Sequence, residues 1–278
     1  MREGTLGSGV QPTARSDRST KPELLGVSHL VLSVSEPSVS GPALEALGYG
    51  EHEANESCQN PREKAPFLSG PLHDTCAMRL MVPANGSPAI EVLGSSKASA
   101  AHPHFEVVLS EQHGAEPEEI RNVLSEDREI VVPGLSRPRG AEGKLGTGAL
   151  LIHVNEIDSA LPLWKTLGCA EEPFNSGMRK VSIRGLRASN RLGLFFVNDR
   201  ENAEAGYLDG VGLVCLSLFC KDADRLRATL HDCGYEVGDC FTLAPFRTSL
   251  RVFFMRNTSG EIYEFLSIAN SRGSEEVS

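Results

Sequence analysis

The sequence lacks a long apolar segment and lacks an excess of basic residues. No stretch approaches the ~20 apolar residues that a membrane-spanning helix requires, and the N-terminus has no apolar core of a secretory signal. The net charge is −10 and the isoelectric point is near 5.3, which argues against a general nucleic-acid-binding surface. We therefore expect a cytoplasmic protein that binds neither membranes nor nucleic acids.

The motifs of several common site types are also missing. The seven cysteines are scattered, and the pairs Cys215/Cys220 and Cys233/Cys240 are spaced too loosely for a zinc motif. An odd, scattered set of cysteines is typical of reduced thiols in the cytosol. The sequence has no Gly-rich nucleotide loop and no Gly-x-Ser-x-Gly element of a serine hydrolase.

The sequence does contain an eight-residue phrase in four copies. Each copy is a strand-like, apolar-rich run that closes with a carboxylate. An internal repeat of this kind indicates a fold built from similar units. The first residue of the phrase varies most between the copies, so it is the position at which we look for function. The copies are His29–Glu36, His104–Glu111, Ala149–Glu156 and Cys215–Asp222.

Each phrase predicts the first strand of a βαβββ unit. A helix is predicted after three of the phrases, over residues 38–47, 159–167 and 223–233. The acids that close these phrases are expected at helix starts, where negative charge is favourable. A glycine follows each helix where a left-handed residue would end it, at Gly48, Gly168 and Gly234. Further strands are predicted over 75–82, 89–93, 179–183, 192–197, 250–255 and 261–268.

The second copy of the unit is shorter than the others. Only 45 positions separate His104 from Ala149, against 75 and 66 for the neighbouring intervals. A strand at 104–109, a helix at 117–125 and a strand at 129–132 precede a Gly- and Pro-rich stretch with the composition of a linker. We therefore expect this unit to have lost its last one or two strands.

Repeated βαβββ units with His in the first strand and Glu in the fourth resemble the vicinal oxygen chelate superfamily. That superfamily includes glyoxalase I, bleomycin- and fosfomycin-resistance proteins and extradiol dioxygenases. The resembling segments are 27–34, 85–93 and 257–266, and the resemblance extends from Gly26 to Asn270. It implies an α+β fold in which repeated βαβββ units form two half-barrel domains, with the second unit truncated.

In that superfamily a divalent metal is held by residues of strands 1 and 4 of the paired units. Carried over to this chain, the resemblance implies His29, Glu91 and His104 as metal ligands and Glu264 as the catalytic general base. Two imidazoles and a carboxylate would suit Fe²⁺, Mn²⁺, Zn²⁺ or Ni²⁺. Each residue also has a simpler interpretation. His29 could be a hydrogen-bonded histidine of a metal-free pocket, and Glu91 a carboxylate that faces solvent at a sheet edge. His104 could belong to a surface loop, and Glu264 could have no functional role.

The third and fourth units offer less. The corresponding positions are Ala149 and Phe195 in the third unit, neither of them a usable ligand, and Cys215 beside Glu264 in the fourth. Cys215 is interpreted as a small buried side chain. His153, two pleats from Ala149, would either line a second pocket or belong to the core. Trp164, the only tryptophan, is expected to pack a helix against the sheet.

The expected domains follow the usual pairing of consecutive units. An alternative is that the first unit pairs with the fourth, which would unite His29, Glu91 and Glu264. Either a monomer or a homodimer is compatible with the sequence. The predicted segments are a disordered stretch at 1–22, a first domain at 23–135, a linker at 136–147, a second domain at 148–270 and a flexible tail at 271–278.

The function implied by the resemblance is that of a metal-dependent lyase, isomerase or dioxygenase acting on a small oxygenated substrate. The first alternative is a metal-free protein of the same fold that binds a small molecule for resistance or sequestration. The second is a scaffold whose clefts are filled with large apolar side chains. Metal content would separate the first two, and the filling of the clefts would support the third.

Overall fold

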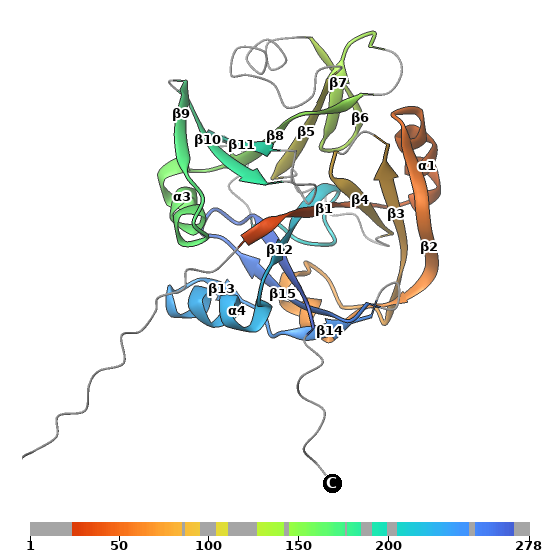
Figure 1. Cartoon of the computed structure of the whole chain (residues 1–278). Coiled ribbons are helices and arrows are strands. Elements are labelled where there is room, and N and C mark those ends of the chain that lie inside the picture. Colours follow the sequence, from red (N-terminus) through yellow and green to blue (C-terminus); the bar gives the residue numbers. More distant parts are fainter. Residues whose placement is uncertain are drawn as a thin grey trace, which may run out of the picture.

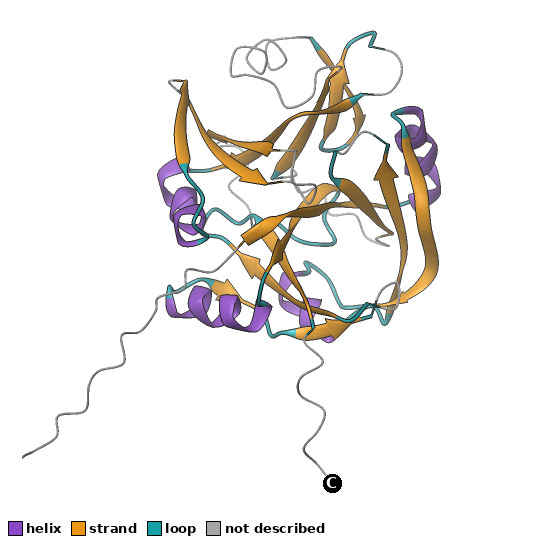
Figure 2. Ribbon diagram, in the orientation of Figure 1, coloured by secondary structure: helices purple, strands orange, loops and turns teal. Residues whose placement is uncertain are grey.

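The computed structural model describes residues 24–84, 87–94, 104–110, 127–141, 145–175, 177–184, 191–198, 205–244 and 248–269. The predicted disordered ends and the predicted helix at 117–125 lie outside these residues. Strands predominate, and the helices lie at the periphery of the strands (Figures 1 and 2). No helix in the described part of the chain is long and apolar enough to cross a membrane.

The first and second units are built mainly from strands. The first unit contains β1 (Leu24–Val34), α1 (Pro37–Ala46), β2 (Tyr49–Gln59), the 3-10 helix η1 (Arg62–Phe67), β3 (Thr75–Pro83) and β4 (Ala89–Gly94). The second unit contains β5 (Phe105–Ser110), β6 (Arg128–Val132) and β7 (Leu135–Pro138). Since β7 begins the stretch predicted as a linker and pairs in parallel with β5, the truncated unit keeps its last strand.

The third and fourth units follow the same order of elements. The third contains β8 (Gly146–Val154), α3 (Ile157–Thr166), β9 (Glu171–Asn175), β10 (Met178–Arg184) and β11 (Arg191–Asn198). The fourth contains β12 (Gly212–Cys220), α4 (Ala223–Asp232), β13 (Glu236–Val237), β14 (Phe241–Leu243), β15 (Leu250–Arg256) and β16 (Ile262–Ile268). The three predicted helices and the strands predicted around them are therefore present.

The strands form two sheets, and each sheet joins two units. The nine-stranded sheet has the order β13-β15-β16-β12-β1-β4-β3-β2, with β14 pairing β15. The seven-stranded sheet has the order β6-β7-β5-β8-β11-β10-β9. In each sheet the first strands of two units meet antiparallel at the centre, as β1 with β12 and β5 with β8.

This strand order corrects the expected pairing of consecutive units. The first unit joins the fourth, and the second joins the third. Each sheet therefore takes one unit from segment 23–135 and one from segment 148–270, and the sheets do not follow that division. The physical reason is hydrogen bonding of the edge: the free side of β1 is satisfied by β12, with Leu30 opposite Leu216.

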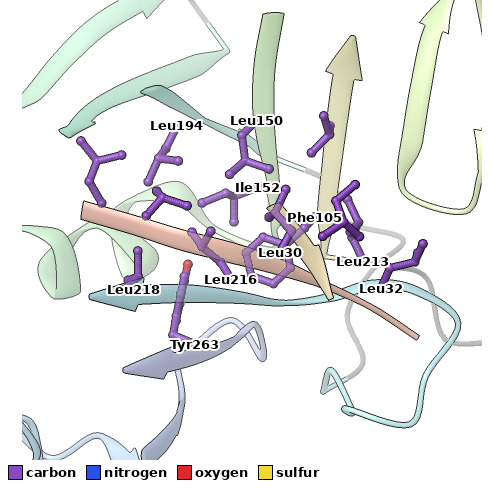
Figure 3. Packing of buried hydrophobic residues seen from close by; sticks show 14 of the residues in the cluster. Leu30, Leu32, Phe105, Leu150, Ile152, Leu194, Leu213, Leu216, Leu218 and Tyr263 are labelled. Atoms are coloured by element: carbon purple, nitrogen blue, oxygen red, sulfur yellow. The ribbon is translucent and has the colours of Figure 1, made fainter. Parts of the chain in front are cut away.

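The main hydrophobic core lies between the two sheets. Leu30 and Leu216 of the nine-stranded sheet are almost completely buried, as are Leu150 and Ile152 of the other (Figure 3). Burying one such side chain contributes roughly 1.5–3 kcal/mol. Because side chains alternate along a strand, the residues on either side of Leu30 in β1 point to the opposite face of the nine-stranded sheet. His29 and Val31 are therefore on the face directed away from the inter-sheet core.

Trp164 connects α3 to both sheets. Its ring meets Phe196 of β11 at 6.0 Å and Tyr263 of β16 at 5.6 Å, in both cases edge to face. The side chain is 1% exposed. The predicted role of this tryptophan in packing a helix against a sheet is thus confirmed.

Candidate functional site

Three of the residues singled out in the sequence meet on the outer face of the nine-stranded sheet. His29 Nε2 lies 2.9 Å from a carboxylate oxygen of Glu91 and 3.3 Å from one of Glu264. We call these three residues the His29 cluster. The cluster is mostly shielded from solvent, since the exposed fractions of the side chains are 14%, 23% and 7% in that order.

Strand pairing explains why these distant residues converge. In the parallel pair β1–β4, Glu91 is opposite Val31, two residues after His29. In the antiparallel pair β1–β12, Ser217 is opposite His29, and Ser217 is in turn opposite Glu264 of β16. The two carboxylates therefore flank the histidine from either side on one face of the sheet.

The opposite charges of the cluster shift the pKa values of His29 and Glu91. Burial alone would lower the pKa of His29, but the facing Glu264 and Glu91 outweigh it and raise that pKa to about 10. Burial raises the pKa of Glu91, while the neighbouring His29 lowers it to a net value below the usual range. At neutral pH the site thus contains an imidazolium between two carboxylates. The Ser28 hydroxyl lies 3.1 Å from the other ring nitrogen, Nδ1.

Cys215, the first residue of the fourth repeated phrase, lies beside the His29 cluster. It is completely buried and is opposite Val31 across the β1–β12 pair. Burial raises the pKa of its thiol well above the usual value, and the charges of Glu264 and Glu91 raise it further. The side chain is thus a small neutral thiol beside the cluster, in agreement with the prediction from sequence.

A cover over this face is formed by η1 and the segment around Leu208. Phe67 at the end of η1 is fully buried and contacts Phe254 with ring centroids 5.8 Å apart. The Leu208 amide donates to the Phe67 carbonyl at 2.9 Å. We call residues 62–70 together with 207–209 the cover. It shields the fourth-unit side of the cluster from water.

An open cavity remains beside the first-unit side. Its volume is about 490 Å³, within the range of small-molecule sites. Two of its lining residues lie on the strands of the cluster, Ser33 on β1 and Leu93 on β4. Others come from the cover and β3, including Lys64, Asp209 and Cys76. The cavity therefore adjoins the His29 cluster on one continuous sheet face.

His104 does not join the cluster, which corrects the predicted ligand set. It directly precedes β5 in the other sheet, is 3% exposed, and its Nδ1 lies 3.1 Å from the His153 carbonyl oxygen. The third residue beside His29 and Glu91 is Glu264, as the alternative pairing of the first unit with the fourth implied. The predicted catalytic residue thus lies in the cluster together with His29.

Strand register explains the misassignment of His104. Val108 is opposite Ala149 across β5–β8, just as Val31 is opposite Cys215 across β1–β12. Glu106, two residues after His104, therefore occupies the position that His29 holds in the other sheet. Alignment of the repeated phrases alone cannot detect a two-residue offset, because it preserves the alternation of side chains.

The equivalent site of the seven-stranded sheet is closed by its own contacts. Glu106 accepts a hydrogen bond from Ser136 at 2.7 Å and lies 3.3 Å from His153 and 3.2 Å from Arg128. Burial raises the pKa of Glu106, but these partners lower it to a net value below the usual range. Phe195 packs on Phe174 at 4.8 Å where the first sheet has Glu264. His153 therefore belongs to an ion-pair network.

The His29 cluster has the chemistry of a metal site but is closed by ion pairs. Within the described residues, no group of three or more His, Cys, Asp or Glu side chains has the spacing of a preformed metal site. However, His29 Nε2 and a carboxylate oxygen of Glu264 are buried without a hydrogen-bond partner of suitable geometry. Buried polar atoms of this kind are uncommon, and an ion is one explanation for them.

Comparison with solved structures shows the fold. The chain is similar to a "putative dioxygenase" from Bacillus subtilis, with 11% identity, 90% of this chain and 87% of that chain covered, and a TM-score of 0.56. A glyoxalase I mutant from Zea mays matches with 12% identity, 87% and 92% coverage, and a TM-score of 0.49. A glyoxalase family protein from Enterococcus faecalis covers 42% of this chain and 94% of its own, at 17% identity and a TM-score of 0.32.

No family model and no curated protein matches the sequence. The chain has an α+β fold with repeated βαβββ units arranged as two half-barrels, and the Bacillus subtilis structure shares this fold.

Proposed function

We propose that the protein holds a divalent metal ion at the His29 cluster and acts on a small oxygenated substrate as a lyase, isomerase or dioxygenase. The observation that carries the proposal is the convergence of one imidazole nitrogen and two carboxylates, from β1, β4 and β16, beside an open cavity. The likeness to a dioxygenase-type fold supports the class of site and leaves the reaction open.

The residues of the cluster fit such an ion. Imidazole nitrogen and carboxylate oxygen are ligands that Fe²⁺, Mn²⁺, Zn²⁺ and Ni²⁺ accept. The two carboxylates carry the charge that a divalent cation neutralises, and Ser28 is in contact with the second nitrogen of the His29 ring, where such contacts fix ring orientation. When bound, the ion would polarise a carbonyl or hydroxyl oxygen of the substrate as a Lewis acid.

The remaining chemistry would come from the chain itself. Glu264 lies on the far unit from Glu91, and the carboxylate oxygen that the ion leaves unbound would take a proton from the substrate. Phe67 and Leu208 would exclude water from the reacting groups, which strengthens electrostatic interactions there. Cys215, as a neutral thiol, would pack against the site.

The alternative is a metal-free protein that binds a small molecule in the same cavity. The observation that favours it is that His29 is already paired with both carboxylates. In this case the cluster would stabilise the sheet and donate hydrogen bonds to a ligand.

Metal analysis of the purified protein tests the proposal. We expect about one equivalent of a divalent metal, lost in His29→Ala and strongly reduced in Glu91→Gln and Glu264→Gln. His153→Ala is the matched control, because His153 also contacts a glutamate but faces only one carboxylate. Metal content that is absent after reconstitution, or equal in His29→Ala and the wild type, would contradict the proposal and favour the metal-free alternative.

A further inference from the structure

Lys64 is a cation at the cavity, and no carboxylate of the described residues forms an ion pair with it. It lies in η1, is half-buried, and its Nζ is 5.8 Å from the centre of the Phe254 ring. Lys165 and Lys180 each lie within 3.5 Å of a glutamate. Among the described residues, none of the ion pairs within 4.0 Å includes Lys64. A half-buried ammonium group without an ion pair is available to an incoming ligand.

Lys64 lies at the wall of the cavity together with Cys76 of β3. Burial raises the pKa of the Cys76 thiol, and Lys64 opposes that rise. Ser33 and Leu93, which lie on the strands of His29 and Glu91, line the same cavity. The ammonium group and the Cys76 thiol therefore face one cavity beside the His29 cluster.

The acidic residues of the cavity are placed differently from Lys64. The Asp209 carboxylate accepts hydrogen bonds from the Ser69 amide, the Ser69 hydroxyl and the Gly70 amide, at 2.8, 2.9 and 3.1 Å. Asp74 is exposed at the start of β3, at the rim. Asp209 thus joins the two segments of the cover, whereas no ion pair within the described part of the chain includes Lys64.

The charged groups of the site indicate the class of ligand. The two carboxylates of the His29 cluster would be engaged by a divalent ion, and the Asp209 carboxylate is hydrogen-bonded to Ser69 and Gly70. An anionic group on the ligand would compensate the charge of Lys64 at low desolvation cost.

We propose that the substrate is an anion, whose carboxylate or ionised hydroxyl group Lys64 binds beside the His29 cluster. This inference rests on the proposed function for the identity of the site. It restricts the small oxygenated substrate to acids and ionisable hydroxyl compounds that fit a cavity of about 490 Å³.

The test uses Cys76 as a reporter inside the cavity. Iodoacetate and iodoacetamide are nearly equal in size and differ in charge, and each is attacked by the thiolate, which forms a C–S bond and releases iodide. The ratio of the two alkylation rates at Cys76, measured by peptide mass spectrometry, reports the preference of the cavity for an anion. A change in the pKa of the thiol affects both reagents alike, so it cancels in the ratio.

We expect the ratio at Cys76 to exceed that at the exposed Cys233, and Lys64→Met to lower it about fivefold, the order expected for a unit charge a few ångströms away in a water-like medium. Lys64→Arg should keep the ratio high. Lys165→Met, on α3 away from the cavity, should leave it unchanged. A ratio unaffected by Lys64→Met, or no higher at Cys76 than at Cys233, would overturn the inference.

The same samples separate this inference from the proposed function. Metal content is measured on each protein before alkylation. A Lys64-dependent ratio in a protein without metal would contradict the metal site and leave anion binding supported. A metal lost only in His29→Ala, together with a ratio independent of Lys64, would support the metal site and overturn anion binding.

Discussion

At the scale of single residues, His29 determines how the proposed metal site would depend on pH. Its imidazolium is held between Glu91 and Glu264, which raise its pKa to about 10 despite burial. A metal ligand must be the neutral imidazole. The proton on His29 therefore has to leave when an ion binds, over the whole neutral range of pH.

This exchange predicts the pH dependence of metal affinity. Between pH 6.5 and 8.5 His29 is protonated in the metal-free protein, so binding should release one proton and affinity should rise about tenfold per pH unit. Above the raised pKa the dependence should level off. Calorimetric titration in buffers of different ionisation enthalpy measures the released proton. A metal affinity independent of pH in this range would show that metal binding does not displace a proton from His29.

Single residues also mark how far sequence reasoning reaches. The resemblance to a family implied His29, Glu91 and Glu264, and these side chains meet in the structure, while their roles in metal binding and catalysis stay predictions. His104 was a wrong assignment because the register of β5 depends on its pairing with β8, which the repeat does not encode. Lys64 was not predicted at all, because it lies in a connection without periodicity and becomes informative only when η1 folds over the sheet.

At the scale of elements, one side chain forms three hydrogen bonds between the two segments of the cover. Asp209 accepts three hydrogen bonds from Ser69 and Gly70, which are distant from it in sequence. Hydrogen bonds to a charged acceptor contribute roughly 1.5–3 kcal/mol each where they are buried, and less where they are exposed, as two of these are. These bonds join the two segments of the cover, in addition to the packing of Phe67 on Phe254.

We expect Asp209→Ala to loosen the cover while leaving the sheets intact. Amide hydrogen exchange of residues 62–70 should accelerate at least several-fold, with a loss of global stability of only about 1–2 kcal/mol. Asp127→Ala is the control, because Asp127 is an exposed partner of Arg139 beside β6 in the seven-stranded sheet. Equal protection of residues 62–70 in both variants would show that apolar packing of Phe67 alone holds the cover.

Elements differ in how clearly the sequence specifies them. The helices α1, α3 and α4 were predicted within two residues, and their terminal glycines have the expected positive φ. Glu36, Glu156 and Asp222 all stand at the predicted N-cap positions, but only the Asp222 side chain accepts a cap hydrogen bond. The strand β2 was missed because it is a mostly exposed, glutamate-rich edge strand without an apolar pattern.

At the scale of the whole molecule, the pairing of units makes the two halves of the chain interdependent. Without β12, β1 would keep a neighbouring strand on one side only, and the same holds for β5 without β8. Contacts of such high sequence separation also favour slow folding, because loop closure precedes the gain in contacts. Linear sequence patterns specify each unit but not its partner, which is why the default pairing was the expectation.

A cut between the second and third units tests this arrangement. We expect the fragments 1–142 and 143–278 to lack a cooperative thermal transition when expressed separately, and to regain one when mixed or co-expressed, since each sheet needs strands from both. Circular dichroism and analytical ultracentrifugation measure folding and association. Independent cooperative folding of fragment 1–142 would contradict the observed pairing of units.

The seam between β1 and β12 has a consequence for the assembly of the cluster during synthesis. His29 and Glu91 leave the ribosome early, whereas Glu264 belongs to β16, the last strand of the described residues. A nascent chain therefore carries an incomplete cluster until β16 is inserted. Under the proposed function, a chain cut before Glu264 would lack one of its three ligands.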